Sequence, residues 1–531
     1  MKNIRIKNKV SIDSIDKNLI EYNSEINFNG FRKIVLSKCF KCKYDKKTTI
    51  FTYEDNLKNK DNENIYYLSK QDFTQLLIDL YEDFIKNFCQ NTRKNEKSVK
   101  TFNFKKFKII SPILFVIFIF CFFIPYVNLF FKCAIILYYS ICIFIKSYFL
   151  IIGCLKRDDF DEESNKKIEI DEEKLKQYTI LVPIFKENKK TIQQLLNAIK
   201  KIDYPKDLLD IKLVLEEDDI KTIEILNTFE LPEYFIKILV PKFDPRTKPK
   251  ACNVASLFAE GENLVIFDAE DIPDKEQILK ASDMFFNNEK ANILQGCLSF
   301  YNYNYNILTE CFNIEYTVWF KIILKIFAEK NITIPLGGTT NYIKYSFLQK
   351  HNFWDSYNVT EDLELSVIAN KYNSKISHLN SDTKEWCVVD IKSFIKQRTR
   401  WIKGYLLTYL IHFFDFKSFK NINNFIFAHV IIGYTSLSFL FLPFLFISLY
   451  SIDNMFLINL WTITNAFYYI TYCFIYYSLI KNIDILIKLK RIFVFIIYPF
   501  YFILHTISAW IAFFEIFYKP FYWAKTNHLN R

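Results

Sequence analysis

Two long apolar segments constrain the fold of this chain more than any other feature. Residues 107–155 and 423–519 are dense in Phe, Ile, Leu and Tyr, whereas residues 1–106 and 156–412 have the composition of water-soluble protein. A helix that crosses a bilayer needs roughly 20 apolar residues, because the hydrocarbon core is about 30 Å thick. The first segment is long enough for two such helices. The chain is therefore predicted to be an integral membrane protein.

The second apolar segment is predicted to contain three or four membrane segments. Residues 425–450 and 455–480 are each long enough for one span. Residues 491–518 are interrupted by Pro499. Because proline disrupts the interior of a helix, they form either one tilted span or two shorter membrane-associated pieces. Two pieces are preferred, because they leave the basic tail, residues 520–531, on the cytoplasmic side.

Many of the cations behind the net charge of +11 flank the apolar segments. The lysines and arginines next to the first two predicted spans are Lys105, Lys106, Lys108, Lys156 and Arg157. Such residues gather in the cytoplasmic loops of membrane proteins. The pattern places residues 1–106, 156–422 and 481–491 in the cytoplasm, and it accounts for the basicity without a nucleic-acid partner.

The soluble region over residues 170–415 alternates short apolar runs with amphipathic stretches. The runs that predict buried strands are 178–185, 211–217, 235–241 and 262–271, and the stretches that predict helices are 191–202 and 220–229. Such alternation predicts an α/β domain with a parallel sheet covered on both faces. Residues 1–100 contain one amphipathic stretch, 72–88, which predicts a surface helix of a small domain of uncertain fold and function.

Charged residues follow three of these strands. They are Lys186 and Glu187 after the first, Glu216 to Asp219 after the second, and Asp268 to Asp271 after the fourth. Because ligands of parallel sheets bind beyond the carboxyl ends of the strands, these residues are predicted to converge on one crevice. The acids Asp268, Glu270 and Asp271 repel one another unless a cation such as Mg²⁺ lies among them. They indicate a metal-bound nucleotide diphosphate, with a solvated acidic loop as the alternative.

Two further segments suit a ligand. Residues 246–255 place Arg246, Lys248, Lys250 and Asn253 before and within a predicted helix, whose N-terminus attracts phosphate or ribose. Glycine is scarce, with 8 in 531 residues, so the adjacent Gly337 and Gly338 indicate a backbone that needs positive φ or close approach to a ligand. Thr339, Thr340 and Asn341 would line that space, and an ordinary turn is the alternative.

Glu361 and Asp362 follow Thr360 at the start of another predicted helix. Thr360 is expected to cap this helix, and acids in its first turn complement the helix dipole. Alternatively, Asp362 is a general base in a partly dry pocket. Spacing alone leaves both interpretations open.

Taken in order, the motifs TILVPIFKE, LVLEEDD, FDAED, GGTTN, TED and QRTRW resemble those of the membrane-embedded family 2 glycosyltransferases, the group of cellulose, chitin and hyaluronan synthases. They look most like a bacterial branch with DAED, NVTED and QRxRWIKG motifs and a terminal PFYWxKTxH, and this chain ends KPFYWAKTNH over residues 519–528. The resemblance covers about residues 107–531. It implies a Rossmann-like GT-A domain embedded between transmembrane helices, in the bacterial inner membrane, with the catalytic domain in the cytoplasm.

The implied reaction is an inverting, metal-dependent transfer from a UDP-sugar to a growing β-linked polysaccharide, processive and coupled to export. The catalytic residues would be Asp362, as the base, and Glu361. The donor-binding residues would be Pro183, Lys186, Glu187, Glu216, Glu217, Lys250, Asn253, Asp268 and Arg400. The family's metal motif is D-x-D, whereas here the third position is Glu, so Mg²⁺ or Mn²⁺ would be held within Asp268, Glu270 and Asp271. The acceptor-binding residues would be Gly338, Thr339, Thr340, Gln397 and Trp401.

Two alternatives to a processive synthase are a single transfer to a lipid or small glycan acceptor and a catalytically inactive membrane scaffold or receptor. The residues of the segment QRTRWIKG, 397–404, are expected to serve two different roles. Gln397, Arg400 and Trp401 are assigned to chemistry. Arg398, Lys403 and the backbone around Gly404 are assigned to placement at the membrane surface, where cations face headgroups.

Overall fold

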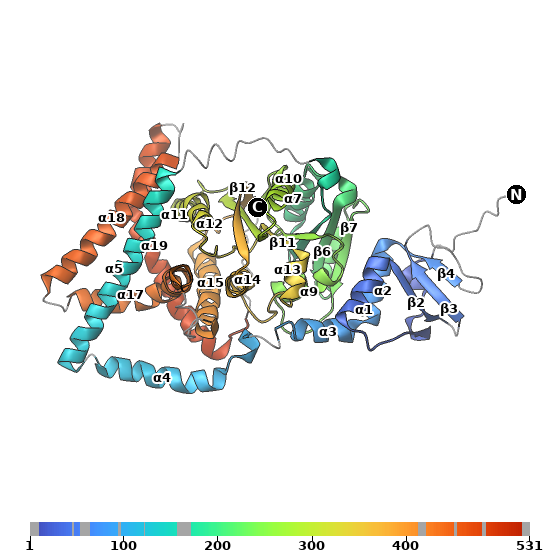
Figure 1. Ribbon diagram of the computed structural model, residues 1–531, viewed down its shortest axis with the longest axis horizontal. Helices are drawn as coiled ribbons and strands as arrows, with labels where there is room; N and C mark the ends of the chain where they lie inside the picture. The colour runs from blue at the N-terminus through green and yellow to red at the C-terminus, as the bar shows by residue number, and fades with distance from the viewer. Residues whose placement is uncertain are drawn as a thin grey trace. The chain divides into compact units, whose positions relative to one another are not determined.

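The computed structural model describes residues 10–44, 47–53, 64–93, 97–121, 123–156, 171–412, 421–450, 454–479 and 485–522. The chain divides into two compact units that interleave along the sequence. The first unit contains Met1–Lys94, Ile170–Glu270 and Asn341–Ser356, and the second contains Asn95–Glu169, Asp271–Thr340 and Tyr357–Arg531. Figure 1 labels the elements of both.

Five hydrogen-bonded strands run through the centre of the first unit. They are β5 (Tyr178–Ile184), β6 (Leu209–Glu216), β7 (Phe235–Val240), β8 (Asn263–Ile266) and β11 (Asn341–Lys344), in the order β7-β6-β5-β8-β11. The first four are parallel to their neighbours, and β11 is antiparallel to β8. All four predicted strands are confirmed, and β11 makes the arrangement mixed.

Helices of the first unit cover these strands. They are α7 (Lys189–Lys200), α8 (Ile220–Asn227), α9 (Lys248–Leu257) and α13 (Tyr345–Lys350). Helix α7 buries Ile192, Leu195, Leu196 and Ile199, the spacing of one apolar helix face. The two predicted helices are confirmed, and the carboxyl ends of β5, β6 and β8 share one edge.

The N-terminal region is a small α/β module within the first unit. Its strands β1 (Ile20–Glu21), β2 (Cys39–Tyr44), β3 (Lys47–Thr52) and β4 (Asn64–Tyr67) pair in that order, and its helices are α1 (Phe28–Ser37), α2 (Lys70–Leu80) and α3 (Glu82–Gln90). The single surface helix predicted over 72–88 is wrong. The stretch forms two helices that meet at Tyr81, and it fully buries Leu76, Leu77 and Ile85.

The soluble part of the second unit contains β9 (Ile272–Pro273), β10 (Ala291–Phe300) and β12 (Lys375–Glu385). Strand β12 pairs in parallel with β10 and antiparallel with β9. The helices are α10 (Gln277–Asn287), α11 (Ile307–Val318), α12 (Leu324–Glu329), α14 (Glu361–Lys371) and α15 (Ile391–His412), and a π-helix over Trp319–Ile323 joins α11 to α12. Sequence analysis identified none of these strands, because β10 and β12 mix polar and apolar residues.

The apolar segments are helical. They form α4 (Phe104–Cys121), α5 (Pro125–Leu155), α16 (Ile422–Phe425) continuing through a π-helix (Ile426–Gly433) into α17 (Tyr434–Tyr450), α18 (Met455–Leu479) and α19 (Ile485–Tyr518). Among the described residues, three stretches are long and apolar enough to cross a membrane: Tyr126–Leu155, Ile422–Ile447 and Phe493–Tyr518. Helix α4, which begins with three lysines, and the Tyr- and Asn-containing α18 are not among them.

The predicted division of 491–518 around Pro499 is wrong. Helix α19 runs without interruption over 34 residues with Pro499 inside it. Proline removes one backbone hydrogen bond, which neighbouring helices tolerate in membrane proteins. Residues 523–531 of the basic tail lie outside the described residues.

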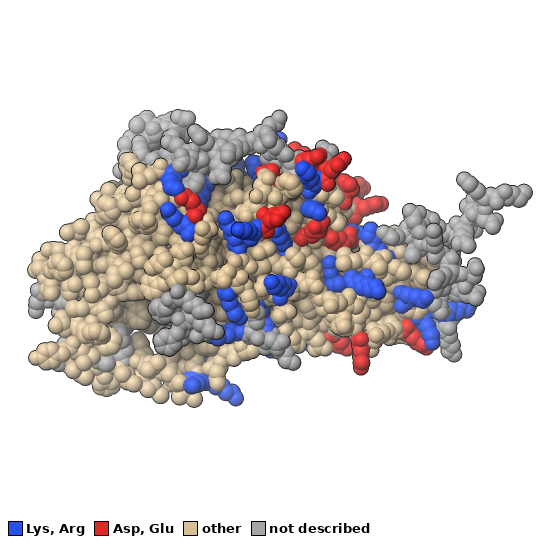
Figure 2. Space-filling view, in the orientation of Figure 1, with Lys and Arg blue, Asp and Glu red and all other residues tan. Residues whose placement is uncertain are grey.

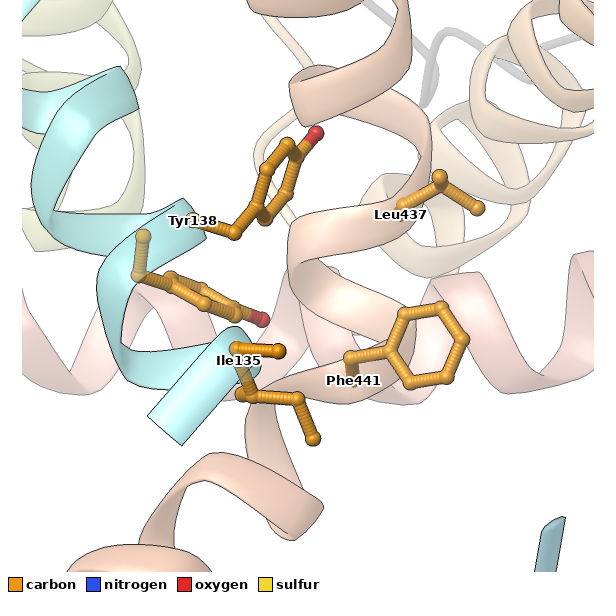
Figure 3. Close-up of a pocket in the computed structure, with 6 residues that line it drawn as sticks. Ile135, Tyr138, Leu437 and Phe441 are labelled. Atoms are coloured by element: carbon orange, nitrogen blue, oxygen red, sulfur yellow. The ribbon is translucent and has the colours of Figure 1, made fainter. Parts of the chain in front are cut away.

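On the face shown in Figure 2, few charged side chains lie over α5, α17 and α18. On α5, Phe130, Ile141 and Phe144 expose more than half of their surface. A pocket between α5 and α17 is lined by Ala134, Ile135, Tyr138, Tyr139, Leu437 and Phe441 (Figure 3). Large apolar side chains exposed on long helices are what a lipid environment accommodates, so this surface suggests membrane association.

Candidate active site

The ends of β5 and β6 are joined by a backbone contact at Lys186. This residue has a φ of 53°, a left-handed conformation that is uncommon outside glycine. Its N–H donates to the Asp219 carboxylate at 2.6 Å, and Asp219 is buried just beyond β6. Pro183 is half-buried in β5, Lys186 is exposed, and Glu187 is half-buried. The sequence-predicted residues of these two strand ends therefore lie at one edge.

Two lysines of α9 connect the ends of β6 and β8. Lys250 is fully buried, with its Nζ 2.7 Å from Oε2 of Glu216, and Lys248 pairs with Asp268. Burial raises the pKa of Glu216, and the Lys250 charge opposes that shift. Thr247 caps α9 by accepting from the Lys250 N–H. Helix α9 therefore carries two ion pairs, Lys250 with Glu216 after β6 and Lys248 with Asp268 after β8.

Glu217 and Asp218, the two residues that follow Glu216, are more exposed than Glu216 itself. Glu217 accepts a hydrogen bond from the Lys242 N–H at 2.7 Å. The Arg246 guanidinium pairs with Asp218, and its hydrogen bond lowers the pKa of that carboxyl. Arg246, which was predicted to suit a phosphate or ribose, is therefore paired with Asp218 at this edge.

Asn253 lies in the interior of the first unit. Its Nδ2 donates to the Trp354 carbonyl at 2.9 Å and to Ser356 Oγ at 3.0 Å, and its Oδ1 accepts from the Trp354 N–H at 3.2 Å. Because the side chain is fully buried, these contacts give it a role in holding the 354–356 loop.

The acids after β8 have different surroundings. The Asp268 side chain is one third exposed, Glu270 is half-buried, and Asp271 is buried, where it accepts a hydrogen bond from the Thr339 hydroxyl. Within the described part of the chain, no group of three His, Cys, Asp or Glu side chains is placed to hold a metal. Asp268 and Glu270 fit Mg²⁺ or Mn²⁺ only as a partial ligand set, which phosphate oxygens and water would complete.

The Gly337-Gly338 segment differs from its prediction. Neither glycine has a positive φ, whereas Thr340 has a φ of 58°. Gly337 instead donates its N–H to Gln295 Oε1 at 2.7 Å, and Gln295 Nε2 donates to the Thr339 carbonyl at 3.3 Å. The glycines therefore lie on a loop fixed by Gln295, a residue that sequence analysis did not identify.

Thr339 and Thr340 are interior residues, with 2% and 0% of their surface exposed. A Cβ atom added to Gly296 would lie 2.4 Å from Thr340 Cγ2, so the glycine at 296 allows Thr340 to pack against β10. Of the predicted acceptor-binding residues in this segment, only Gly338 is partly exposed.

Asp362 lies in the first turn of α14 and is half-buried, whereas Glu361 is buried. The expected Thr360 cap is wrong, because its side chain makes no capping hydrogen bond; Asn358 Oδ1 accepts the Thr360 N–H at 3.0 Å instead. Asp362 Oδ1 accepts from the Leu363 N–H at 2.7 Å. Burial, and then the Asp362 charge, raise the pKa of Tyr405 on α15, so this carboxylate lies near α15.

Arg398 and Lys403 of α15 do not face lipid headgroups, so their assignment to membrane anchoring is wrong. Arg398 is 6% exposed and donates to both carboxylate oxygens of Glu315 on α11, at 2.9 and 2.7 Å. Lys403 is 1% exposed, with its Nζ 2.7 Å from Glu515 on α19. A buried cation requires a partner, and these two pairs fix α15 to its neighbouring helices.

Gln397, Arg400 and Trp401 each keep part of their surface exposed. The Arg398 guanidinium lies 4.6 Å from the centroid of the Trp401 ring. The same ring stacks near Tyr316, with centroids 6.5 Å apart. The partly exposed Trp401 ring is therefore packed against Arg398 and Tyr316.

Gly404 permits close contact between α15 and the start of α14. An added Cβ would lie 2.2–2.8 Å from three Thr360 atoms. We expect Gly404→Ala to lower the free energy of unfolding by about 1–3 kcal/mol, because overpacking shifts the backbone. The loss is measured as a fall in the thermal unfolding midpoint of Gly404→Ala relative to wild type in detergent.

The melting experiment has two controls. Gly30→Ala meets a flexible Ile26 side chain at 3.0 Å and should change stability little. Thr360→Ala in the Gly404→Ala background removes two of the three clashing atoms and should restore part of the loss. An unchanged midpoint for Gly404→Ala would show that the close contact is absent.

Part of the chain matches a known family. Residues 264–516 match the family model described as "Glycosyl transferase family group 2". The match covers slightly less than half of the chain, so the chain is similar to this family over that stretch. The matched residues include Asp268, the Gly337-Gly338 loop, Asp362 and Trp401.

The chain is also similar to a curated protein, "Probable glycosyltransferase YdaM" of Bacillus subtilis (strain 168). The two are 29% identical over 265 residues, which are 46% of this chain and 59% of the relative. The chain thus matches less than two thirds of the length of that protein.

Solved structures are also similar to this chain. The mannosyltransferase PcManGT from Pyrobaculum calidifontis, in complex with GDP-Man and Mn²⁺, is 16% identical, with a TM-score of 0.47 covering 73% of this chain and 99% of that one. S. aureus TarS 1-349 in complex with UDP-GlcNAc is 15% identical, with a TM-score of 0.32 covering 64% of this chain and 92% of that one.

Proposed function

We propose that the protein is an inverting, metal-dependent hexosyltransferase with a GT-A catalytic domain. It transfers a sugar from a UDP-sugar to a growing β-linked polysaccharide, processively and with export across the membrane. The observation that carries the proposal is the strand edge of the first unit, where Lys250 pairs with Glu216 and Lys248 pairs with Asp268. The match of residues 264–516 to the family 2 glycosyltransferase model supports it.

The first unit is proposed to hold the donor. A diphosphate brings negative charge that competes for Lys248, which frees Asp268 to bind a divalent ion with Glu270. Mg²⁺ or Mn²⁺ bound there would neutralise the UDP leaving group. The side chains proposed to surround the nucleotide are Pro183, Lys186, Glu187, Glu216, Glu217 and Lys250, and Arg400 is proposed to contact the diphosphate.

The second unit is proposed to act on the acceptor. Asp362 takes the proton of the acceptor hydroxyl as that oxygen attacks the anomeric carbon. A new carbon–oxygen bond forms on the face opposite the breaking bond to the phosphate oxygen, so the configuration inverts and UDP leaves. Trp401 offers an aromatic face for a sugar ring, with Gln397 and Gly338 as further acceptor contacts.

The proposed role of Asp268 as a metal ligand can be tested by substitution. Asp268→Ala is expected to lower sugar transfer at least about 100-fold, because the leaving group loses its metal-neutralised charge. The measurement is UDP release with Mn²⁺ and with EDTA. The matched control is Glu262→Ala, an exposed acid at the other end of β8, which should retain wild-type transfer. Equal rates for Asp268→Ala and wild type would refute the metal assignment.

Product size separates processive synthesis from single transfer. Incubation of the purified protein with radiolabelled UDP-sugars should give long chains early in the reaction, before substrate is depleted. Short, discrete products would support the single-transfer alternative. No incorporation at all would support the inactive scaffold.

Contacts within the first unit support a proposal for the membrane topology. Residues 10–93 contact residues 171–270 in the first unit; for example, Arg32 donates to the Leu257 carbonyl. Both stretches must lie on one side of the membrane. If α5 crosses, α4 must therefore cross as well, which supports the two predicted spans and a cytoplasmic catalytic domain. Protease accessibility of the N-terminal module in intact cells tests this.

The end of α19 also bears on topology. Lys403 Nζ donates to the carbonyls of Lys519 and Tyr522 at 3.2 and 3.0 Å, so this end lies beside α15 of the soluble part. We propose that the chain crosses the membrane an even number of times between α15 and residue 519. The tail would then lie in the cytoplasm, although α19 is a continuous helix.

A further inference from the structure

The N-terminal module is docked on the catalytic part of the first unit by buried polar contacts. The Gln71 side chain pairs with the backbone of Lys237, accepting from its N–H at 2.8 Å and donating to its carbonyl at 2.9 Å. This contact covers the outer edge of β7. Lys70 lies 3.3 Å from Asp210 and 2.8 Å from Glu260. Because these contacts satisfy an edge strand and buried charges, the module is an integral part of the unit.

Helix α1 of the module holds the C-terminal end of α9. The Arg32 guanidinium is 8% exposed and donates to the carbonyls of Leu257 and Ala259 at 2.9 and 2.6 Å. It also lies 4.7 Å from the centroid of the Tyr345 ring. A cation on the last carbonyls of a helix satisfies acceptors that the helix itself leaves unpaired.

The end of α3 holds two loops that adjoin the other end of α9. The Cys89 carbonyl accepts from Ser356 Oγ at 2.7 Å, Gln90 Nε2 donates to the Asp244 carbonyl at 3.1 Å, and Arg93 donates to the His351 carbonyl. The two loops are 244–247 and 351–356. Thus three contacts from the end of α3 and the residues that follow it hold the loop before α9 and the 351–356 loop.

These loops are bonded in turn to α9 itself. Thr247, the cap of α9, donates through Oγ1 to the Ser356 carbonyl at 2.6 Å. Asn253, inside α9, donates to Ser356 Oγ at 3.0 Å. Ser356 therefore connects α3 to the helix that carries Lys248 and Lys250.

We infer that the N-terminal module positions the donor site by clamping α9 at both ends. Arg93, Gln90 and Ser356 act as positioning residues, which set Lys248 and Lys250 against Asp268 and Glu216. The inference rests on the proposed function, since it assigns these lysines to the donor. A small displacement of binding groups reduces affinity and rate strongly, so loosening the clamp should weaken donor binding first.

The test uses full-length protein in detergent and three variants. Ser356→Ala removes one oxygen atom, Arg93→Met removes the cation, and Arg93→Lys keeps a donor for the His351 carbonyl. Lys86→Ala is the matched control, because Lys86 is exposed on the same helix α3. The readouts are the Kd for UDP with Mn²⁺ by calorimetry, and KM and kcat with a UDP-sugar.

Ser356→Ala and Arg93→Met should raise the Kd for UDP and the donor KM about tenfold, as the loss of a buried hydrogen bond allows. Their kcat should stay within about twofold, Arg93→Lys should recover most of the affinity, and Lys86→Ala should match wild type. If Arg93→Met fails to fold, Ser356→Ala decides alone.

Unchanged UDP affinity in Ser356→Ala, with wild type binding normally, would overturn the clamp and leave the proposed function intact. A fall in melting temperature with equal losses in kcat and affinity would reduce the module to a structural role and would likewise overturn it. A wild-type protein that binds no UDP and transfers no sugar would overturn the proposed function together with the clamp.

Discussion

Replacing Asp362 with Asn should lower kcat for sugar transfer by about 10²–10⁴-fold, the range expected when a general base is removed. Asn has the same shape but cannot take the proton of the acceptor hydroxyl. The carboxylate is half-buried in the first turn of α14, so the substitution leaves packing unchanged. UDP release by wild type and variant measures the effect.

Two measurements make the Asp362→Asn result specific. The Kd for UDP should stay within about twofold of wild type, because a catalytic base contributes to the transition state rather than to nucleotide binding. Glu361→Gln changes the buried neighbour and should lower kcat far less. A variant Asp362→Asn with more than a tenth of wild-type kcat would exclude Asp362 as the base.

Breaking the Glu315–Arg398 ion pair is expected to lower the free energy of unfolding more than any other substitution proposed for this protein. Glu315→Gln leaves the Arg398 guanidinium buried without a carboxylate, a change that costs about 3–5 kcal/mol. Tyr501, whose hydroxyl lies 2.7 Å from Glu315, would lose its charged acceptor as well. The expected result is a thermal midpoint lowered by about 5–10 °C, measured by scanning fluorimetry in detergent.

The matched control for Glu315→Gln is Glu329→Gln. Glu329 pairs with Lys156, and both side chains are about one third exposed or more, so this loss should cost at most about 1 kcal/mol. Replacing both the buried Arg398 and its partly exposed partner, with Glu315→Leu and Arg398→Met together, should recover part of the stability. Equal midpoints for Glu315→Gln and Glu329→Gln would contradict a buried pair at Arg398.

The sequence predicts the parallel strands well because each is a continuous apolar run, as in β6, where every residue is buried. It fails where burial depends on distant partners. Arg398 and Glu315 are 83 residues apart, and Lys403 and Glu515 are 112 apart, so cations that read as surface anchors are interior. The available signal was Glu315 among the largely apolar residues 311–318, since a charge in such a stretch needs a partner.

The glycines illustrate the same limit. Scarcity indicates that each remaining glycine has a structural cause. Of the two causes expected at Gly337 and Gly338, positive φ occurs at Thr340 instead, and close approach to a ligand stays a prediction. Gly296 and Gly404 are required by close approach of Thr340 and Thr360, contacts that no spacing rule reveals. The N-terminal module could not be assigned, because its role depends on packing against α9 and β7.

The most direct test of the account is sugar transfer by the purified full-length protein in lipid nanodiscs. A panel of radiolabelled UDP-sugars is supplied with Mg²⁺ or Mn²⁺, and UDP release and labelled product are both followed. The account predicts metal-dependent incorporation from at least one UDP-sugar into a β-linked product, and none with Asp362→Asn. Absence of incorporation from every UDP-sugar, or equal incorporation by Asp362→Asn, would contradict it.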